Sequence, residues 1–171
     1  MRLSLIFAAA TLLASCSDLT NPPNPVTEAD PLKPLSVNPP AHWRLLVDKP
    51  NFPVAMSIFN IPNPADPAGK ESTNVVVAAY AADSKPAQDT LATTKKRFAK
   101  SNLTTRNQAG WEVESYSEIQ GVTRYRFLDG TKVQVDKTLF IRLAWPTLPA
   151  NAPDYDAEMQ KSFDQLLSQV H

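Results

Sequence analysis

The side chains of this sequence that could do chemistry are mainly carboxylates. Glu112, Glu114 and Glu118 lie on one face of a predicted β-strand, with Asp129 and Asp136 in the segments that follow. Two carboxylates at the right separation can hydrolyse a glycosidic bond. The alternative is the solvated face of a sheet, which we favour because such hydrolases usually need a deep cleft. We therefore expect no catalytic residue among them.

Other catalytic and metal-binding residue types are scarce. The chain has two histidines, His42 and His171, and one cysteine. A Ser/His/Asp triad needs a well-placed histidine, and zinc sites are usually built from Cys and His clusters. Calcium loops need an Asp-rich run with a set spacing, which is absent from the sequence. We therefore expect no metal, no cofactor and no enzymatic activity.

The one cysteine, Cys16, follows a short apolar N-terminal segment. Residues 3–13 are almost entirely apolar, but this run is shorter than the about 20 residues that span a bilayer. Together with the positive charge at Arg2 and the small residues at 14–15, it has the pattern of a secretory signal peptide. A signal peptide places the rest of the chain outside the cytoplasm.

The tetrapeptide Leu13-Ala14-Ser15-Cys16 resembles the lipobox of bacterial lipoprotein precursors. The resemblance implies that residues 1–15 are removed and that Cys16 is acylated as the first mature residue. Two or more acyl chains anchor a protein stably in a membrane. The alternative is an ordinary signal peptide cleaved nearby, which leaves a free thiol.

The residues after Cys16 bear on which membrane holds the anchor. By the same resemblance, an aspartate directly after the cysteine retains lipoproteins at the inner membrane of Gram-negative bacteria. Ser17 stands at that position, and Asp18 follows it. We favour the inner leaflet of the outer membrane, with the domain facing the periplasm, and keep the inner membrane as the alternative.

The composition divides the mature chain in two. Residues 16–40 hold many of the 16 prolines, so we expect a lipidated cysteine followed by a disordered, partly polyproline II spacer. Residues 41–171 are long enough for one domain with its own core, and they contain no cysteine to form disulfides. The chain has 17 basic and 17 acidic residues, a balance that gives no reason to expect nucleic acid as a partner.

The pattern of this domain predicts an α+β fold, a single domain with a mainly antiparallel sheet and two helices. A nearly continuous Val and Ala run at 73–80 indicates the middle of the sheet. Strands are expected at 43–47, 54–61 and 73–80, a helix at 84–100, a three-stranded meander at 111–119, 122–128 and 132–145, and a closing helix from 153.

The meander is expected to turn at Gln120-Gly121 and at Asp129-Gly130. A three-residue loop with a bulge at the second turn keeps the apolar side chains of neighbouring strands on one face. This register places Arg124 and Arg126 outside. The side chains expected in the core are Tyr125, Phe127, Val133, Val135, Leu139, Ile141, Leu143 and Trp145.

Both helices carry readable side-chain patterns. Cations crowd the end of the helix at 84–100, where they either dock an acidic partner or complement the helix dipole, and we favour the dipole. The closing helix has apolar residues at spacings of three and four, which predicts a face packed on the sheet. The cations are Lys95, Lys96, Arg97 and Lys100, and the apolar residues are Tyr155, Met159, Phe163, Leu166, Leu167 and Val170.

The order of these elements over residues 41–170 resembles the PsbP/DcrB-like family. The features that carry the resemblance are His42-Trp43, the lysine-rich helix, the strand ending at 140–145 and the closing helix with Phe163. Members of that fold class serve mainly as assembly factors, accessory subunits and binding modules. The resemblance therefore implies a role in binding, although a fold does not fix a function.

We expect a lipid-anchored, non-enzymatic binding or assembly module of the cell envelope. It contacts the membrane through the lipid on Cys16, and its partner is another envelope or effector protein. Two versions stay open, an accessory subunit of an envelope complex and an immunity protein against a periplasmic effector. Trp43, Trp111 and Trp145 are the candidate contact residues. The opposing class is an envelope-polymer hydrolase or a small-molecule carrier, which an empty pocket lined by Glu or Asp favours.

Overall fold

The computed structural model describes residues 35–63, 66, 72–149, 151 and 153–171. In this part of the chain, seven antiparallel strands form one sheet, and two helices pack on it. The predicted α+β class, with a single domain and two helices, is confirmed. The elements are β1 (Arg44–Lys49), β2 (Val54–Ile61), β3 (Thr73–Ala81), α1 (Lys85–Lys96), β4 (Ser101–Gln108), β5 (Trp111–Gln120), β6 (Thr123–Val133), β7 (Lys137–Pro146) and α2 (Tyr155–Gln169).

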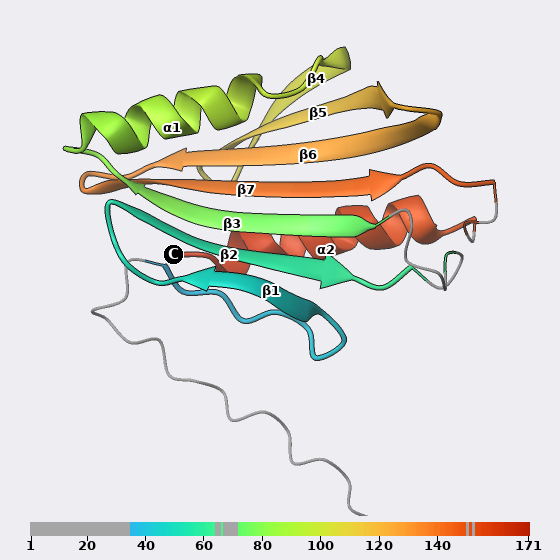
Figure 1. The fold of residues 1–171 in the computed structure, drawn as a ribbon, viewed down its shortest axis with the longest axis horizontal. Helices are drawn as coiled ribbons and strands as arrows, with labels where there is room; N and C mark the ends of the chain where they lie inside the picture. Colours follow the sequence, from blue (N-terminus) through green and yellow to red (C-terminus); the bar gives the residue numbers. More distant parts are fainter. Residues whose placement is uncertain (1–34, 64–65, 67–71, 150, 152) are drawn as a thin grey trace, which may run out of the picture.

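The strands follow the order β1-β2-β3-β7-β6-β5-β4, so β7 is central and β3 lies beside it (Figure 1). The Val and Ala run predicted for the middle of the sheet is therefore one strand from the centre. Side chains of β3 alternate between the two faces, with Val75 and Val77 in one core cluster and Ala78 and Tyr80 in the other. Each cluster is covered by a different helix.

Helix α2 covers the larger core cluster and passes behind the strands in Figure 1. Its predicted apolar face is confirmed, since every residue named for it is buried. Pro153 precedes the helix, and Asp156 and Glu158 complement the positive end of its dipole. We refer to this side of the sheet as the α2 face.

The predicted turn at Asp129-Gly130 is wrong, because β6 continues through both residues to Val133. A Cβ atom at Gly130 would lie 3.0 Å from Leu167 Cδ2 and 3.3 Å from the Phe163 ring, so glycine leaves the space that α2 occupies. The chain reverses later, where Gln134 donates its backbone N–H to the Lys137 carbonyl at 2.8 Å. Gly130 therefore serves helix packing rather than a turn.

Moving this turn changes the register that we predicted for the meander. Val133 is 78% exposed, and Val135, in the new turn, is fully exposed, so neither belongs to the core. Phe127 is buried as predicted and Tyr125 is half-buried, but both lie on the face opposite α2. The bulge proposed to align the valines is therefore not needed.

Helix α1 packs on the other side of the sheet, the α1 face. Ser84 accepts a hydrogen bond from the Ala87 N–H at 3.4 Å as its N-cap, and Pro86 occupies the first turn, as the sequence indicated. The helix buries only Ala87 and Leu91 against the sheet. With twelve residues, α1 is shorter than α2 and leaves part of its face uncovered.

Strand β4 was not predicted. Its side chains are exposed at all positions except the last, so it lacks the apolar alternation that marks a half-buried strand. It pairs with β5 at the edge of the sheet, from Gln108 opposite Trp111 to Ser101 opposite Ser117. Only pairing with a neighbouring strand reveals it.

Part of the predicted spacer lies on the domain. Leu35 and Val37 pack against the core under α2, and Ser36 donates its N–H to the His171 carbonyl at 3.2 Å. The folded unit therefore begins before the predicted boundary at Ala41. The predicted signal peptide, Cys16 and the spacer up to residue 34 lie outside the described residues. In the described part, no helix is long and apolar enough to span a membrane.

Candidate functional site

A groove of about 600 Å³ opens on the α1 face, beside and below the C-terminal half of α1. Its floor crosses β2, β3, β7 and β6, which makes it roughly 14 Å wide between the outer strands. Six apolar side chains of the floor are only half-buried, whereas their counterparts on the α2 face are fully covered. These groove residues are Val54, Met56, Ile58, Val76, Tyr125 and Ala144.

The register of the strands explains how the groove meets a polar region. Ile58 lies opposite Val76, and Val76 lies opposite Arg142, so this row is apolar on β2 and β3 and becomes charged on β7. The row continues from Arg142 to Asp129 on β6 and to Glu114 on β5. The α1 face thus has an apolar half and an ionic half, with Arg142 at the boundary.

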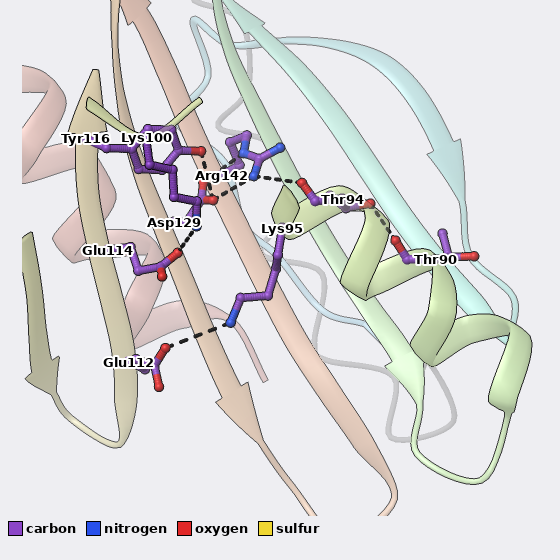
Figure 2. Close-up of polar contacts among 9 residues, drawn as sticks. All are labelled: Thr90, Thr94, Lys95, Lys100, Glu112, Glu114, Tyr116, Asp129 and Arg142. Carbon is purple, nitrogen blue, oxygen red and sulfur yellow. Dashed lines mark hydrogen bonds and ion pairs between the residues drawn. The ribbon is translucent and has the colours of Figure 1, made fainter. Parts of the chain in front are cut away.

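Arg142 forms a buried two-point ion pair with Asp129 (Figure 2). Arg142 Nε donates to Asp129 Oδ1 at 2.8 Å, and Nη2 donates to Oδ2 at 2.6 Å. The side chains are only 7% and 1% exposed. The hydroxyl of Tyr116 donates to Asp129 Oδ2 at 3.0 Å, which gives the carboxylate a third hydrogen bond. A buried charge is tolerated when it is paired and hydrogen-bonded in this way.

Arg142 also holds α1 on the sheet. Its Nη2 donates at 3.1 Å to the backbone carbonyl of Thr94 near the C-terminal end of the helix, a carbonyl that also accepts the N–H of Arg97 at 3.4 Å. The guanidinium carbon lies 4.9 Å from the ring centroid of Phe98 and 5.2 Å from that of Phe140. Arg142 therefore links the central strand, the end of α1 and the aromatic rings of Phe98 and Phe140.

The pKa values in this cluster favour its present charge state. Burial raises the pKa of Tyr116 well above its ordinary value of 10.0, and the nearby charge of Asp129 raises it further. Burial alone lowers the pKa of Arg142, but the hydrogen bonds and the charge of Asp129 outweigh it, so the net direction is upward. The tyrosine stays neutral and the arginine stays charged, and neither is poised to exchange a proton near pH 7.

The predicted glutamate row does lie on one face of β5, where it meets the cations at the end of α1. Lys95 pairs with Glu112 at 3.9 Å, and Lys100 forms a close ion pair with Glu114. Glu118 Oε1 accepts the backbone N–H of Ala99 at 3.1 Å. Figure 2 shows the first two pairs reaching across from α1 and the segment after it. The sequence interpretation of these cations considered the helix dipole and an acidic partner, but not these ion pairs. Lys95 and Lys100 attach the end of α1 and the segment after it to β5.

The three tryptophans proposed as contact residues are all buried, which contradicts that role. Trp43, Trp111 and Trp145 are 7%, 0% and 3% exposed and belong to the core cluster under α2. Trp111 Nε1 donates to the Leu167 carbonyl at 2.9 Å, and Trp145 Nε1 donates to Asp156 Oδ1 at 2.7 Å. Large aromatic side chains with one polar atom are placed in this way in a core. They stabilise the α2 face and present no surface.

The chemistry of the groove depends on the side chains that line it. The described residues lining the groove include no aspartate, glutamate or histidine. Within the same part of the chain, no group of three or more Cys, His, Asp or Glu side chains could hold a metal ion. The carboxylate with the most buried position, Asp129, is occupied by Arg142 and Tyr116.

Sequence reasoning missed the groove and the Arg142–Asp129 pair. The lining residues come from five strands, from α1 and from the segments before β3 and after α1, so no local pattern joins them. The pair did leave a signal, because Arg142 interrupts a strand whose neighbours Ile141 and Leu143 are both apolar. A charged residue in such a strand needs a buried partner of opposite charge.

No protein-family model matches this chain, and a search of curated proteins finds no match. LpqN of Mycobacterium tuberculosis, described as involved in cell envelope biogenesis, is a structural neighbour at 14% identity, covering 80% of this chain and 81% of LpqN, with a TM-score of 0.44. A protein from Bacteroides thetaiotaomicron has 13% identity and a TM-score of 0.45; the match covers 80% of this chain and 44% of that protein. This chain thus matches less than half of that second protein. At these scores the likeness is one of general fold and carries no functional information.

Proposed function

We propose that this protein is a lipid-anchored, non-enzymatic binding module of the cell envelope and that the groove on the α1 face is its ligand site. The observation that carries the proposal is the open, mainly apolar groove on a sheet whose other face is filled. Ligand sites are typically concave, mostly apolar and within the range of about 300–1,000 Å³. The groove of about 600 Å³ fits that description.

Binding is favoured over hydrolysis by the chemistry of the lining. An envelope-polymer hydrolase needs an acid and a base facing its substrate, and the described lining residues supply neither. The carboxylates nearby are engaged in ion pairs with Lys95, Lys100 and Arg142. The same groove favours a small-molecule carrier as the second candidate, beside an accessory subunit or an immunity protein.

The anchor rests on the sequence at Leu13-Ala14-Ser15-Cys16. We place the acylated Cys16 in the inner leaflet of the outer membrane, with the domain in the periplasm, and the inner membrane is the alternative. A Cys16→Ala variant of the full chain should lose acyl labelling and shift from the membrane fraction to the soluble fraction. Unchanged fractionation contradicts the anchor without affecting the groove.

The groove is tested by photo-crosslinking in cells that make the full chain. A photoreactive phenylalanine analogue replaces Ile58 on the groove floor, and in a matched variant it replaces Gln165, an exposed residue of α2 on the opposite face. We expect a discrete adduct, small molecule or protein, from position 58 alone. Adducts that are equal at both positions, or absent from position 58, contradict the proposal.

A further inference from the structure

The lining of the groove contains side chains that hydrogen-bond within the protein. The Thr90 and Thr94 hydroxyls donate to carbonyls one turn earlier in α1, at 2.8 and 2.9 Å. The Asn74 amide donates to Ser72, and the Gln120 amide donates to Glu118 Oε2 at 3.1 Å. Few groups in the lining therefore remain to pair with polar atoms of a ligand.

The backbone beneath the groove is occupied as well. Strands β2, β3, β7 and β6 each pair with a neighbour on both sides, so their N–H and C=O groups are used within the sheet. A peptide laid in the groove would bury its own backbone groups without partners, at a cost of about 1–3 kcal/mol for each. A hydrocarbon chain has no such groups and gains about 0.8 kcal/mol for each CH₂ that it buries.

The charged side chains that line the groove are both positive, and the nearby carboxylate of Glu118 accepts hydrogen bonds from Gln120 and from the Ala99 N–H. The two charged residues in the lining are Arg97 and Arg142, and Asp129 neutralises Arg142. Arg97 is exposed at the end of α1, and it makes no ion pair with a carboxylate in the described part of the chain; its guanidinium carbon lies 5.3 Å from the Phe98 ring centroid. Across the floor, exposed Lys49 of β1 lies opposite Met56 and on the same face.

We propose that the groove holds the hydrocarbon chain of an anionic amphiphile, with the chain on the floor and the anionic head group at Arg97. This inference rests on the proposed function, in which the groove binds a ligand. The floor supplies apolar area from four strands, Phe98 and Phe127 form an aromatic wall, and the guanidinium at the rim selects a negative head. Arginine suits a carboxylate or phosphate head because its planar donors can pair with two oxygens.

The test measures binding of laurate, below the concentration at which it forms micelles, to the full protein by calorimetry. Dodecanol, which has the same chain and no charge, is the matched ligand, and an extended apolar peptide is the competing class. We expect the wild-type protein to bind laurate more tightly than dodecanol and to show no binding of the peptide. Preference for the peptide, or absence of laurate binding, overturns the inference.

Variants separate the chain site from the head-group site. Ile58→Trp and the milder Ala144→Leu both fill the floor, and at least tenfold weaker binding of laurate and dodecanol is expected from whichever of them folds. Arg97→Gln should weaken laurate about tenfold, the effect of losing about 1.4 kcal/mol, and leave dodecanol unchanged. Lys96→Gln, the control on the exposed neighbouring residue, should change laurate binding less than twofold. Equal effects of Arg97→Gln on both ligands contradict the head-group site.

The two proposals fail in different ways. If photoreactive position 58 yields an adduct but laurate does not bind, the groove is a ligand site for another class of molecule and only this inference is wrong. If position 58 yields no adduct and laurate does not bind, the proposed function fails with it. If laurate binds equally to the wild-type and the filled variants, the contact lies elsewhere and the inference is again wrong.

Discussion

The two faces of the sheet are built from the same strands but are covered in different ways. On the α2 face, a 15-residue helix covers a continuous core cluster in which nearly every large side chain is buried. On the α1 face, a 12-residue helix covers a small cluster, and the rest is an open groove and a network of ion pairs. The difference indicates that the α2 face supplies most of the stability, which leaves the α1 face free for the binding that we propose.

The two helices are also attached by different forces. Helix α2 is held by burial of its apolar side chains, whose free energy grows with the area removed from water. Helix α1 buries little and is attached at its C-terminal end by Arg142 and Lys95. The partly exposed Lys95–Glu112 pair contributes at most about 1 kcal/mol, and the single hydrogen bond from Arg142 to the Thr94 carbonyl contributes about 1.5–3 kcal/mol. Both are small beside the burial of the apolar side chains of α2, so α1 should open before the sheet unfolds.

The largest effect is expected from replacing a buried leucine by alanine in each of the two helices. Leu166→Ala in α2 removes a side chain that is 1% exposed and should lower the free energy of unfolding by about 3–5 kcal/mol, measured by urea denaturation. Leu91→Ala in α1 should cost about 2 kcal/mol and should increase amide hydrogen exchange mainly within α1. Equal global losses from the two variants contradict the unequal roles of the faces.

A smaller loss of stability is expected from removing one buried tyrosine hydroxyl on each face. Tyr116 on the α1 face donates to the carboxylate of Asp129, whereas Tyr155 on the α2 side shares a hydrogen bond of 2.8 Å with the hydroxyl of Thr73. Hydrogen bonds to charged groups are the stronger. Tyr116→Phe should therefore cost about 1.5–3 kcal/mol at pH 7, and Tyr155→Phe about 0.5–1.5 kcal/mol.

The pH dependence of this effect follows from the direction of the pKa shifts. Burial is the largest cause that raises the pKa of Tyr116 and of Tyr155 above 10.0 in the folded protein. The folded state therefore keeps these protons when the unfolded chain loses them, so their contribution is complete below pH 10 and declines as pH rises above it. Urea unfolding between pH 8 and about 11 should show a shallower decline for Tyr116→Phe than for the wild type; an unchanged slope contradicts the shift.

The sequence predicted what depends on local pattern. The apolar face of α2 repeats every three or four residues, and β2 was predicted with its observed bounds. The shared face of Glu112, Glu114 and Glu118 also followed from alternation along one strand. Each of these features is decided within a single element, so the sequence of that element is enough.

The errors concern residues whose role is set by a distant part of the chain. Asp-Gly is a strong local turn signal, but Arg142 pairs with Asp129 and α2 fills the space above Gly130. In the same way, the burial of Trp111 depends on α2, in which the Leu167 carbonyl accepts the hydrogen bond from Trp111 Nε1. The groove is the extreme case, because no element contains more than a few of its lining residues.

The smallest expected effect is the sharpest comparison, because it uses neighbouring residues of one type on one strand. Val77 is fully buried under α2, and Val76 is half-buried on the groove floor. Val77→Ala should cost about 2 kcal/mol, since it removes buried methyl groups and leaves a cavity. Val76→Ala should cost less than about 1 kcal/mol, since water already reaches that side chain and no closed cavity forms.

The same two variants then connect stability with binding. Val76→Ala widens the groove floor and should weaken laurate binding by a few fold, because about two methyl groups of contact are lost. Val77→Ala faces away from the groove and should leave laurate binding within twofold of the wild type while it lowers the free energy of unfolding. If both variants lose stability equally and neither changes binding, the two faces share one role, and the separation of a supporting face from a binding face is wrong.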